Sequence, residues 1–193
     1  MRLAFASRLD RLAYKYKTDK TPFINHNYTN TYRKLFENLE VKKLLEIGIG
    51  HSDKGVHGYM GNSDYKNGAS LYMWRDYFPK AQIFGCDIVK EIIFNDDRIN
   101  CFQCDQSNKD SVLELINKTG EDFDIVIDDG SHITEHQIIS AQTLLPFVRE
   151  GGYYIIEDVL YAEKIIKFLP DYNCEIVICS DKRIDDKLIV IKK

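Results

Sequence analysis

Residues 43–50 have the sequence KLLEIGIG, a short apolar run that ends in two glycines one residue apart. The content of Leu44, Leu45 and Ile47 is typical of a strand that is covered on both faces. Glycines directly after such a strand let the backbone pass close to a ligand, although a tight turn without a ligand would need the same residues. The stretch predicts the central strand of a parallel sheet in an α/β protein.

From residue 41 onward, short apolar runs alternate with segments of helical character, which is the pattern of strands joined by crossover helices. The predicted strands cover residues 43–49, 82–86, 99–104, 123–127, 153–156, 175–179 and 188–191, and the predicted helices between them cover 70–78, 110–117 and 134–145. The last two strands are joined by too few residues for a helical crossover, so one of them is expected to be antiparallel. The pair Gly151-Gly152 is expected to form the turn before the fifth strand.

The first 40 residues are predicted to form a helical segment, with helices at 4–16 and 30–39. The polar stretch 17–28 between them has little apolar content to hold it against a core, so we expect it to act as a lid. The loop 51–68 is longer than most strand-to-helix loops, and long loops in this position usually serve a ligand. With 41–193 as the sheet domain, the 193 residues should form a single compact domain.

The composition excludes several classes of partner. Lys and Arg number 26 against 30 Asp and Glu, so the positive field that holds a phosphate backbone is missing and no nucleic-acid partner is expected. The first ten residues contain no uninterrupted apolar stretch, which argues against a signal peptide or membrane anchor. Five scattered cysteines indicate a reducing, cytoplasmic location. Cys101 and Cys104 lie three apart in a predicted strand, so they should face opposite sides as packed thiols.

Acidic residues follow the predicted strands, at the edge of a parallel sheet where ligands bind. They are Asp87, Asp105, Asp128, Asp129, Glu157 and Asp158. Carboxylates gathered in one crevice have raised pKa values unless a cation balances them. Asp129, Glu157 and Asp158 offer the hard oxygen ligands that Mg²⁺ prefers. The alternative is that these acids only cap the helices that follow and bind nothing.

Two further residues point to a nucleoside cofactor and to proton transfer. Asp87, at the end of the second strand, can accept hydrogen bonds from both hydroxyls of a ribose, which suits NAD or S-adenosylmethionine equally. The third glycine and the phosphate cradle of a dinucleotide site are missing, which favours S-adenosylmethionine. His132 follows Asp129 by three residues and is placed to act as a general base beside a metal. His136, one helical turn later, is more typical of a supporting or surface residue.

These motifs resemble those of class I S-adenosylmethionine-dependent methyltransferases, and within that class the metal-dependent macrolide and rhamnosyl sugar O-methyltransferases. The similarity covers KTDK at 17–20 with His26, Tyr28 and Tyr32, LLEIGIG at 44–50, GASLYMWRDYFP at 68–79, DQS at 105–107, IDDGSH at 127–132 and GGYYIIED at 151–158. The elements DDGSH and ED, in this order, are the specific part, whereas the glycine motif is shared with many nucleotide-binding proteins.

The resemblance implies a Rossmann-like, seven-stranded, mostly parallel sheet with an antiparallel C-terminal hairpin and helices on both faces. It implies S-adenosylmethionine as cofactor, in a site lined by Glu46, Gly48, Gly50, Ser70, Asp87, Asp105, Gln106 and Asp128. It also implies a divalent metal, Mg²⁺, held by Asp129, Glu157 and Asp158, with Asp129 and His132 as catalytic residues. His132 would remove the proton of a hydroxyl on a rhamnose-like sugar of a glycan or glycoside.

Other functions remain open at this stage. A catechol-type acceptor would chelate a metal as well as a sugar does, a NAD-dependent oxidoreductase would share the sheet and the Asp87 contact, and a binding domain could keep the fold without catalysis. Family members commonly carry an additional N-terminal domain, where this chain has only residues 1–39. The acceptor is therefore open, as is whether the chain works as a homo-oligomer or as part of a longer multidomain protein.

Overall fold

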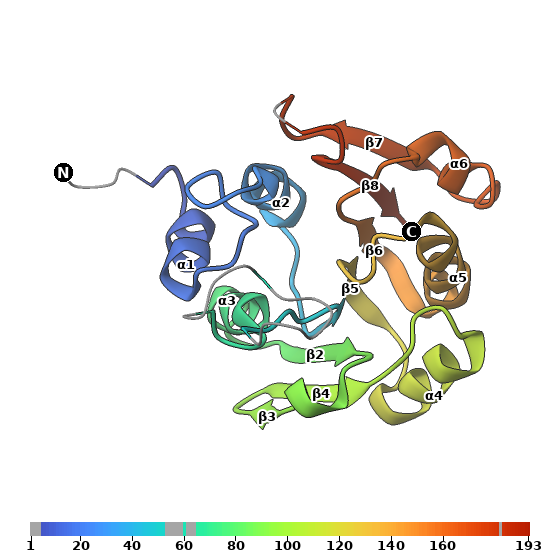
Figure 1. Ribbon diagram of the computed structural model, residues 1–193, viewed down its shortest axis with the longest axis horizontal. Coiled ribbons are helices and arrows are strands. Elements are labelled where there is room, and N and C mark those ends of the chain that lie inside the picture. Colours follow the sequence, from blue (N-terminus) through green and yellow to red (C-terminus); the bar gives the residue numbers. More distant parts are fainter. Residues whose placement is uncertain (1–4, 53–59, 61–64, 182) are drawn as a thin grey trace.

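The computed structural model describes residues 5–52, 60, 65–181 and 183–193, and its centre is an eight-stranded sheet in the order β3-β4-β2-β1-β5-β6-β8-β7 (Figure 1). The strands are β1 (Lys43–Ile47), β2 (Gln82–Asp87), β3 (Asn95–Asp96), β4 (Ile99–Gln103), β5 (Phe123–Asp128), β6 (Val148–Ile156), β7 (Cys174–Ile178) and β8 (Lys187–Lys192). The helices are α1 (Arg8–Tyr16), α2 (Tyr28–Phe36), α3 (Ala69–Tyr77), α4 (Lys109–Thr119), α5 (Thr134–Leu144) and α6 (Ala162–Ile166), with 3₁₀ turns η1 (Lys90–Ile92) and η2 (Leu145–Phe147).

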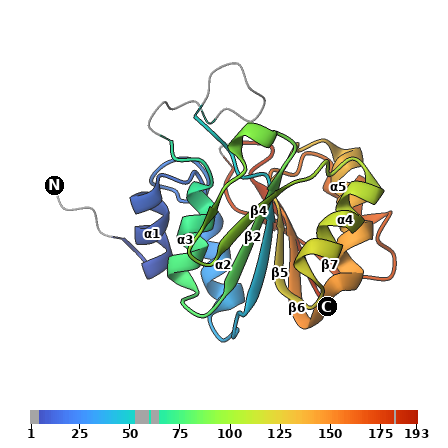
Figure 2. The same ribbon diagram turned by 90° about the horizontal axis from the view of Figure 1, so that it is seen from below.

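The sheet is covered by helices on both faces, as predicted. Successive side chains of β1 point to opposite faces, so Leu44 joins one hydrophobic cluster and Leu45 joins the other. Helices α1, α2 and α3 lie over the first face, and α4, α5 and α6 lie over the second (Figure 2). Because β1 is buried from both sides and lies between β2 and β5, it is the central strand that its apolar sequence predicted.

The strand directions confirm a mostly parallel sheet with an antiparallel closing pair. Strands β4, β2, β1, β5 and β6 are parallel, whereas β8 is antiparallel to both β6 and β7. The sheet has eight strands instead of the seven expected, because the two residues of β3 pair with β4 in an antiparallel sense. The carboxyl ends of the five parallel strands therefore meet at one edge, where the acidic residues follow them.

The prediction of a turn at Gly151-Gly152 is wrong, since both residues lie inside β6. Gly151 has a φ of 76°, a value that favours glycine, and a Cβ on Gly152 would lie 2.9 Å from the carbonyl oxygen of Asp124. The pairing of β6 with β5 changes register between Phe123 and Ile125. The two glycines thus allow an irregularity within a long strand, which a local turn pattern does not distinguish from a true turn.

The polar stretch 17–28 is packed against the rest of the protein, contrary to the loose attachment expected for it. Helix α1 ends at Lys17, whose φ of 60° turns the chain inward, and Thr18, Lys20, Thr21 and His26 are all buried. Polar contacts hold this stretch in place, so its low apolar content was a poor guide to its burial. Most of the loop 51–68, predicted to serve a ligand, lies outside the described residues.

The two cysteines of the predicted third strand lie on opposite faces of the sheet, as expected. Cys101 belongs to the hydrophobic cluster under α3 and Cys104 to the cluster on the other face, so they do not face each other. Both are free thiols, and burial raises the pKa of Cys101 to about 12, which makes it a poor nucleophile. In the part of the chain that the structure describes, no helix has both the length and the apolar character to cross a membrane.

We predict that Gly85→Ala destabilises the fold by about 1–3 kcal/mol, because added core volume forces buried neighbours to move. A Cβ at this position in β2 would lie 2.5 Å from Leu71 Cδ1 and 2.9 Å from Ile49 Cγ2, both from buried side chains. Urea unfolding followed by circular dichroism measures the change. Ile184→Ala, at a side chain that is 74% exposed, is the control and should change the free energy of unfolding by less than about 0.5 kcal/mol. Equal stability of Gly85→Ala and wild type would contradict the tight packing between β2 and α3.

Candidate functional site

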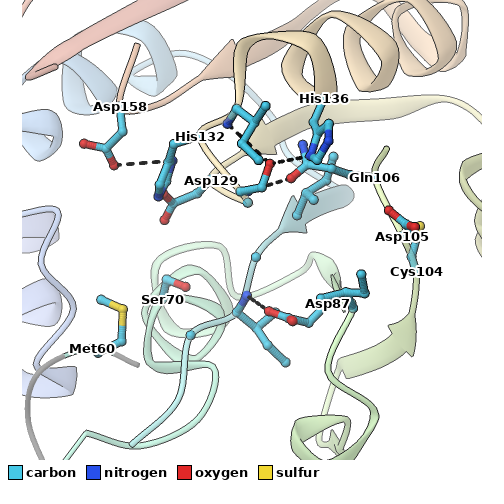
Figure 3. Close-up of a pocket in the computed structure, with 18 of the residues that line it drawn as sticks. Met60, Ser70, Asp87, Cys104, Asp105, Gln106, Asp129, His132, His136 and Asp158 are labelled. Carbon is cyan, nitrogen blue, oxygen red and sulfur yellow. Dashed lines mark hydrogen bonds and ion pairs between the residues drawn. The ribbon is translucent and has the colours of Figure 1, made fainter. Parts of the chain in front are cut away.

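A cavity of about 380 Å³ opens at the carboxyl edge of the parallel strands (Figure 3). Its size lies in the range of small-molecule and cofactor sites. Nine of the twelve residues predicted for the site line it: Gly48, Gly50, Ser70, Asp87, Asp105, Gln106, Asp129, His132 and Asp158. The other three, Glu46, Asp128 and Glu157, are buried beneath it and do not line it. The strand ends therefore bring most of the predicted residues together.

The glycines after β1 allow two loops of the site to approach each other. Gly48 has a φ of 82°, and a Cβ there would lie 2.0 Å from the carbonyl oxygen of Asp129. A Cβ on Gly50, whose φ is 60°, would lie 2.9 Å from the hydroxyl of Tyr65. Gly48 is thus needed for contact between the loops after β1 and β5, and this requirement exists whether or not a ligand is bound.

Asp87 and Asp105 face the cavity from the ends of β2 and β4 (Figure 3). Asp87 accepts the backbone N–H of Ile49 at 3.1 Å on Oδ2 and that of Val89 at 3.0 Å on Oδ1. Asp105 accepts the backbone N–H of Ser107 at 2.9 Å. Asp105 Oδ1 also accepts the hydroxyl of Ser107 at 2.6 Å, so Asp105 Oδ2 and both oxygens of Asp87 keep lone pairs that can accept hydrogen bonds from hydroxyl groups in the cavity.

Gln106 and Asp128 fix the turn that carries Asp129 and His132. The side-chain amide of Gln106 donates to Asp128 Oδ1 at 2.9 Å, and its carbonyl oxygen accepts the backbone N–H of Ser131 at 2.7 Å. Burial raises the pKa of Asp128, while hydrogen bonds from Ser140 and Gln106 oppose that shift. Asp128 therefore acts from below the cavity, through Gln106, and the structure gives it no direct place in the cavity wall.

Asp129, His132 and Asp158 form the part of the site that could hold a metal ion. One potential ligand atom from each residue lies within 4.8 Å of the others, and His132 Nδ1 is 4.0 Å from Asp158 Oδ2. His132 and Asp158 both have left-handed backbones, with φ values of 56° and 50°. Non-glycine residues in this conformation are uncommon and concentrate at functional sites. The loops after β5 and β6 thus direct two carboxylates and an imidazole to one spot.

Glu157, predicted as a third metal ligand, lies deeper and is already paired. Its Oε2 accepts the ammonium of Lys20 at 2.7 Å, and its Oε1 accepts the hydroxyl of Tyr32 at 2.5 Å. The same ammonium lies 2.5 Å from Asp129 Oδ2 and 3.2 Å from Glu46 Oε1. Burial raises the pKa of Glu157, and the charge of Asp129 adds to this, whereas Lys20 opposes it. The counter-charge that the acids require comes in part from the chain itself.

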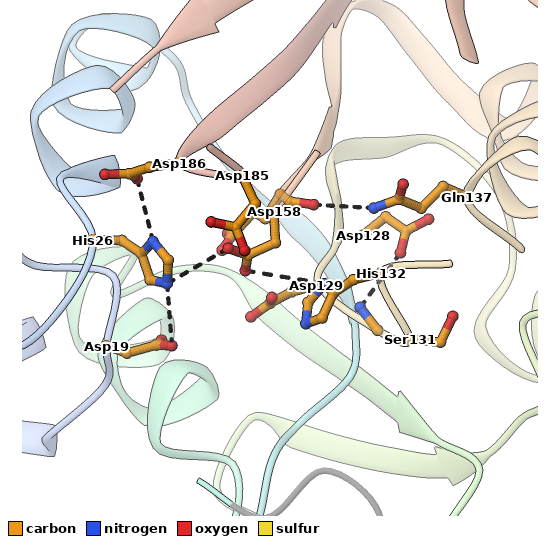
Figure 4. A network of polar contacts seen from close by, with 12 residues as sticks. Asp19, His26, Asp128, Asp129, Ser131, His132, Gln137, Asp158, Asp185 and Asp186 are labelled. Carbon is orange, nitrogen blue, oxygen red and sulfur yellow. Dashed lines mark hydrogen bonds and ion pairs between the residues drawn. The ribbon is translucent and has the colours of Figure 1, made fainter. Parts of the chain in front are cut away.

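His26 makes a second link between the N-terminal stretch and the acids (Figure 4). Its Nδ1 is 3.2 Å from Asp186 Oδ1, and its Nε2 is 3.5 Å from Asp158 Oδ1. The hydroxyl of Tyr28 donates to the same oxygen of Asp158 at 3.0 Å, and the rings of Tyr28 and His26 stack. Asp158 is therefore held on one carboxylate oxygen, and its Oδ2 faces His132.

Lys20 and His26 were not predicted as site residues, although both lie in the segment quoted for the resemblance. The signal available in the sequence was the charge balance, because buried carboxylates at strand ends need cations, and the stretch 17–28 contains two lysines and one histidine. His136, predicted as a supporting residue, lines the cavity, and its Nδ1 is 2.9 Å from Ser131 Oγ.

The chain is similar in sequence to known O-methyltransferases. No family model matches the chain. The chain is 40% identical over 153 residues to the 8-demethyl-8-(2-methoxy-alpha-L-rhamnosyl)-tetracenomycin-C 3'-O-methyltransferase of Streptomyces olivaceus. The matched region covers 78% of this chain and 36% of that protein. The chain is 37% identical over 153 residues to the mycinamicin VI 2''-O-methyltransferase of Micromonospora griseorubida, with the same coverage of both chains. The chain thus spans little more than a third of the length of these relatives.

Solved structures give the same relationship. The MycE methyltransferase of the mycinamycin biosynthetic pathway, in complex with Mg and SAH, has a TM-score of 0.72 and 29% sequence identity over 97% of this chain and 55% of that chain. The fold is also shared by a putative caffeoyl-CoA O-methyltransferase from Staphylococcus aureus. The TM-score is 0.61 and the sequence identity 15%, and the match covers 97% of this chain and 93% of that chain.

We predict that Gln106→Ala costs about 1–3 kcal/mol of stability, since it removes one of the hydrogen bonds to the buried Asp128 and the acceptor of the Ser131 backbone N–H. Chemical unfolding measures the loss. Gln103→Ala is the matched control, because the exposed side chain of Gln103 donates one hydrogen bond, to the carbonyl of Ile88 at the surface, and the variant should lose less than about 0.5 kcal/mol of stability. Similar losses in the two variants would show that Gln106 does not fix the turn.

Proposed function

Because the chain is homologous to the macrolide and rhamnosyl sugar O-methyltransferases, a group of class I S-adenosylmethionine-dependent enzymes, we propose that it transfers a methyl group to a sugar hydroxyl with the help of a divalent metal. The observation that carries the proposal is the meeting of three features at one edge of the sheet. A cavity of about 380 Å³ lies beside the partly exposed carboxylates of Asp129 and Asp158, and His132 borders both. Metal-assisted methyl transfer to oxygen uses this combination of donor site, cation and base.

The cavity suits S-adenosylmethionine by its size and by the position of its acceptors. Asp87 and Asp105 keep lone pairs free at the ends of β2 and β4, where a ribose binds in folds of this kind. We assign Gly48, Gly50, Ser70, Asp87, Asp105 and Gln106 to the cofactor site, with Glu46 and Asp128 supporting it from below. In the relative MycE, the complex that was solved contains SAH.

The donor set at the strand ends suits a hard divalent cation, with Mg²⁺ as the proposed ion. Mg²⁺ is usually bound by one or two carboxylates and keeps its remaining positions for water and substrate. Asp129 and Asp158 offer these carboxylates, at side-chain exposures of 19% and 11%. Glu157 stays a proposed third ligand, and it would have to share or give up its contact with Lys20 in order to reach the ion.

The residues of the chain then have distinct tasks in the transfer. A bound cation supplies Lewis acidity that favours loss of the hydroxyl proton of an acceptor. His132 accepts this proton as the oxygen forms its bond with the methyl group and the bond between methyl and sulfur breaks. The contacts of Asp158 with His26 and Tyr28 hold it in place, and the Gln106 contacts hold the turn of His132. Catalysis consists mainly of such positioning.

Further proposals concern the acceptor, the domain organisation, the location and the partners of the protein. We propose a rhamnose-like sugar of a glycan or glycoside as acceptor, because two relatives are named for methylation of rhamnosyl groups. We assign residues 1–40 as a helical segment and 41–193 as the cofactor-binding domain. Five free cysteines support a reducing, cytoplasmic location. We propose no nucleic-acid partner, because a net charge of −4 does not supply the positive field that holds a phosphate backbone.

We predict that Asp158→Asn lowers metal-stimulated methyl transfer by about 100-fold or more, because a neutral amide binds a divalent cation poorly. The assay measures SAH released from S-adenosylmethionine in the presence of a rhamnoside, with Mg²⁺ or with EDTA. Asp171→Asn, at an exposed acid distant from the site, is the control and should keep wild-type turnover. Calorimetry should show SAH bound by both variants and NAD by neither. Activity of the wild type that persists in EDTA would contradict the metal assignment.

We predict that His132→Ala lowers kcat by about 10²–10⁴-fold, the usual contribution of a general base, and leaves SAH binding intact. His136→Ala is the comparison, since His136 lines the same cavity but its imidazole bonds to Ser131 and not to the acids among the described residues, so its effect on kcat should be clearly smaller. Initial rates of SAH release and calorimetric SAH titrations provide both quantities. If the two variants lose kcat equally, His132 is not the base.

A further inference from the structure

The ammonium of Lys20 occupies the centre of the acid cluster. Lys20 is fully buried and does not line the cavity, so it contacts neither cofactor nor acceptor directly. Its Nζ lies 2.5 Å from Asp129 Oδ2, 2.7 Å from Glu157 Oε2 and 3.2 Å from Glu46 Oε1. A buried lysine is costly unless carboxylates surround it, and here three do. This ammonium is a permanent cation next to the place proposed for the divalent ion.

The local backbone fixes Lys20 in this position. After the left-handed Lys17, the chain folds back on itself through hydrogen bonds from the N–H of Thr29 to the carbonyl of Lys20 at 3.0 Å and from the N–H of His26 to the carbonyl of Asp19 at 2.8 Å. The same turn places His26 beside Asp158. A single short segment therefore brings Lys20 to Glu46, Asp129 and Glu157, and His26 to Asp158.

The other contacts of the cluster divide its carboxylates into two kinds. Glu157 and Glu46 are closed off, because Tyr32 donates to Glu157 and the indole of Trp74 donates to Glu46 Oε2 at 2.7 Å. Asp129 is shared, since it contacts Lys20 through Oδ2 and also faces the cavity with Asp158 and His132. Asp129 is thus the residue through which Lys20 and a divalent ion would act on each other.

We propose that Lys20 is a positioning residue that competes with the divalent cation for Asp129 and Glu157, and so neutralises the acid cluster when no metal is bound and limits how tightly metal binds. The inference deepens the proposed function and rests on it. One ammonium cannot balance three carboxylates, so the cluster keeps an excess of negative charge that attracts a second cation. At the same time, a positive charge this close repels a divalent ion and weakens its binding. The metal-free protein stays folded because Lys20 is present.

The test is Lys20→Met, which keeps most of the side-chain length and removes the charge. Mn²⁺ binding, followed by loss of the free-ion electron paramagnetic resonance signal, should tighten by about tenfold or more. In EDTA the variant should unfold at lower urea concentration than wild type, and saturating Mn²⁺ should narrow that gap, because a ligand that binds the folded state stabilises it. Lys15→Met, at a lysine with 57% side-chain exposure, is the control and should change neither quantity. Unchanged or weaker Mn²⁺ binding by folded Lys20→Met would overturn the proposal.

A second variant keeps the test decisive if Lys20→Met does not fold. Glu46→Gln leaves the ammonium in place and removes one of its partners, so the unbalanced Lys20 charge should weaken Mn²⁺ binding, and equal or tighter binding would overturn the competition. Asp158→Asn separates this outcome from failure of the proposed function. Loss of Mn²⁺ binding in Asp158→Asn with no change in Lys20→Met refutes only the role of Lys20. Absence of Mn²⁺ binding in wild type, Lys20→Met and Glu46→Gln alike refutes the metal site and, with it, the competition.

Discussion

The burial of carboxylates at the ends of β1, β5 and β6 is the constraint on which the rest of the structure depends. A buried carboxylate is stable only if cations or hydrogen-bond donors surround it. Lys20, Tyr32 and Trp74 meet this requirement for Glu46 and Glu157, and they come from the N-terminal stretch, α2 and α3. The carboxylates of Asp129, Glu157 and Glu46 raise the pKa of Lys20 well above its usual value despite its burial, so the ammonium stays charged. The acids thereby attach the N-terminal helices to the sheet.

The same requirement explains why only part of the cluster is available for chemistry. Glu46 and Glu157 are buried and hydrogen-bonded to Trp74 and Tyr32, whereas Asp129 and Asp158 line the cavity. The left-handed backbones of His132 and Asp158 cost energy, and such conformations persist only where the surrounding structure fixes them. Gln106 does this for the turn after β5, and Tyr28 does it for the residue after β6. The site is therefore rigid in the parts that would hold a cation and a base.

The sequence was sufficient for the features that depend on local patterns. The apolar run of β1 predicted a central strand, the strand ends predicted where the acids gather, and the short connection before β8 predicted that one of the last two strands is antiparallel. Features that depend on distant contacts were missed. Gly151 and Gly152 have the composition of a turn but form an irregularity in a strand, and a two-residue strand such as β3 has no periodicity. The stretch 17–28 has few apolar residues, and its burial depends on ion pairs with residues more than 100 positions away.

The central claim is that Asp129 and Asp158 hold a divalent cation beside a cavity for the methyl donor. Crystals of the protein grown with Mn²⁺ and SAH allow a direct test through the anomalous diffraction of manganese. The account predicts one strong anomalous peak at about 2–2.3 Å from carboxylate oxygens of both residues, with SAH in the cavity bordered by Asp87 and Gly48. A peak elsewhere, or SAH bound with Asp129 and Asp158 turned away from any ion, would contradict it.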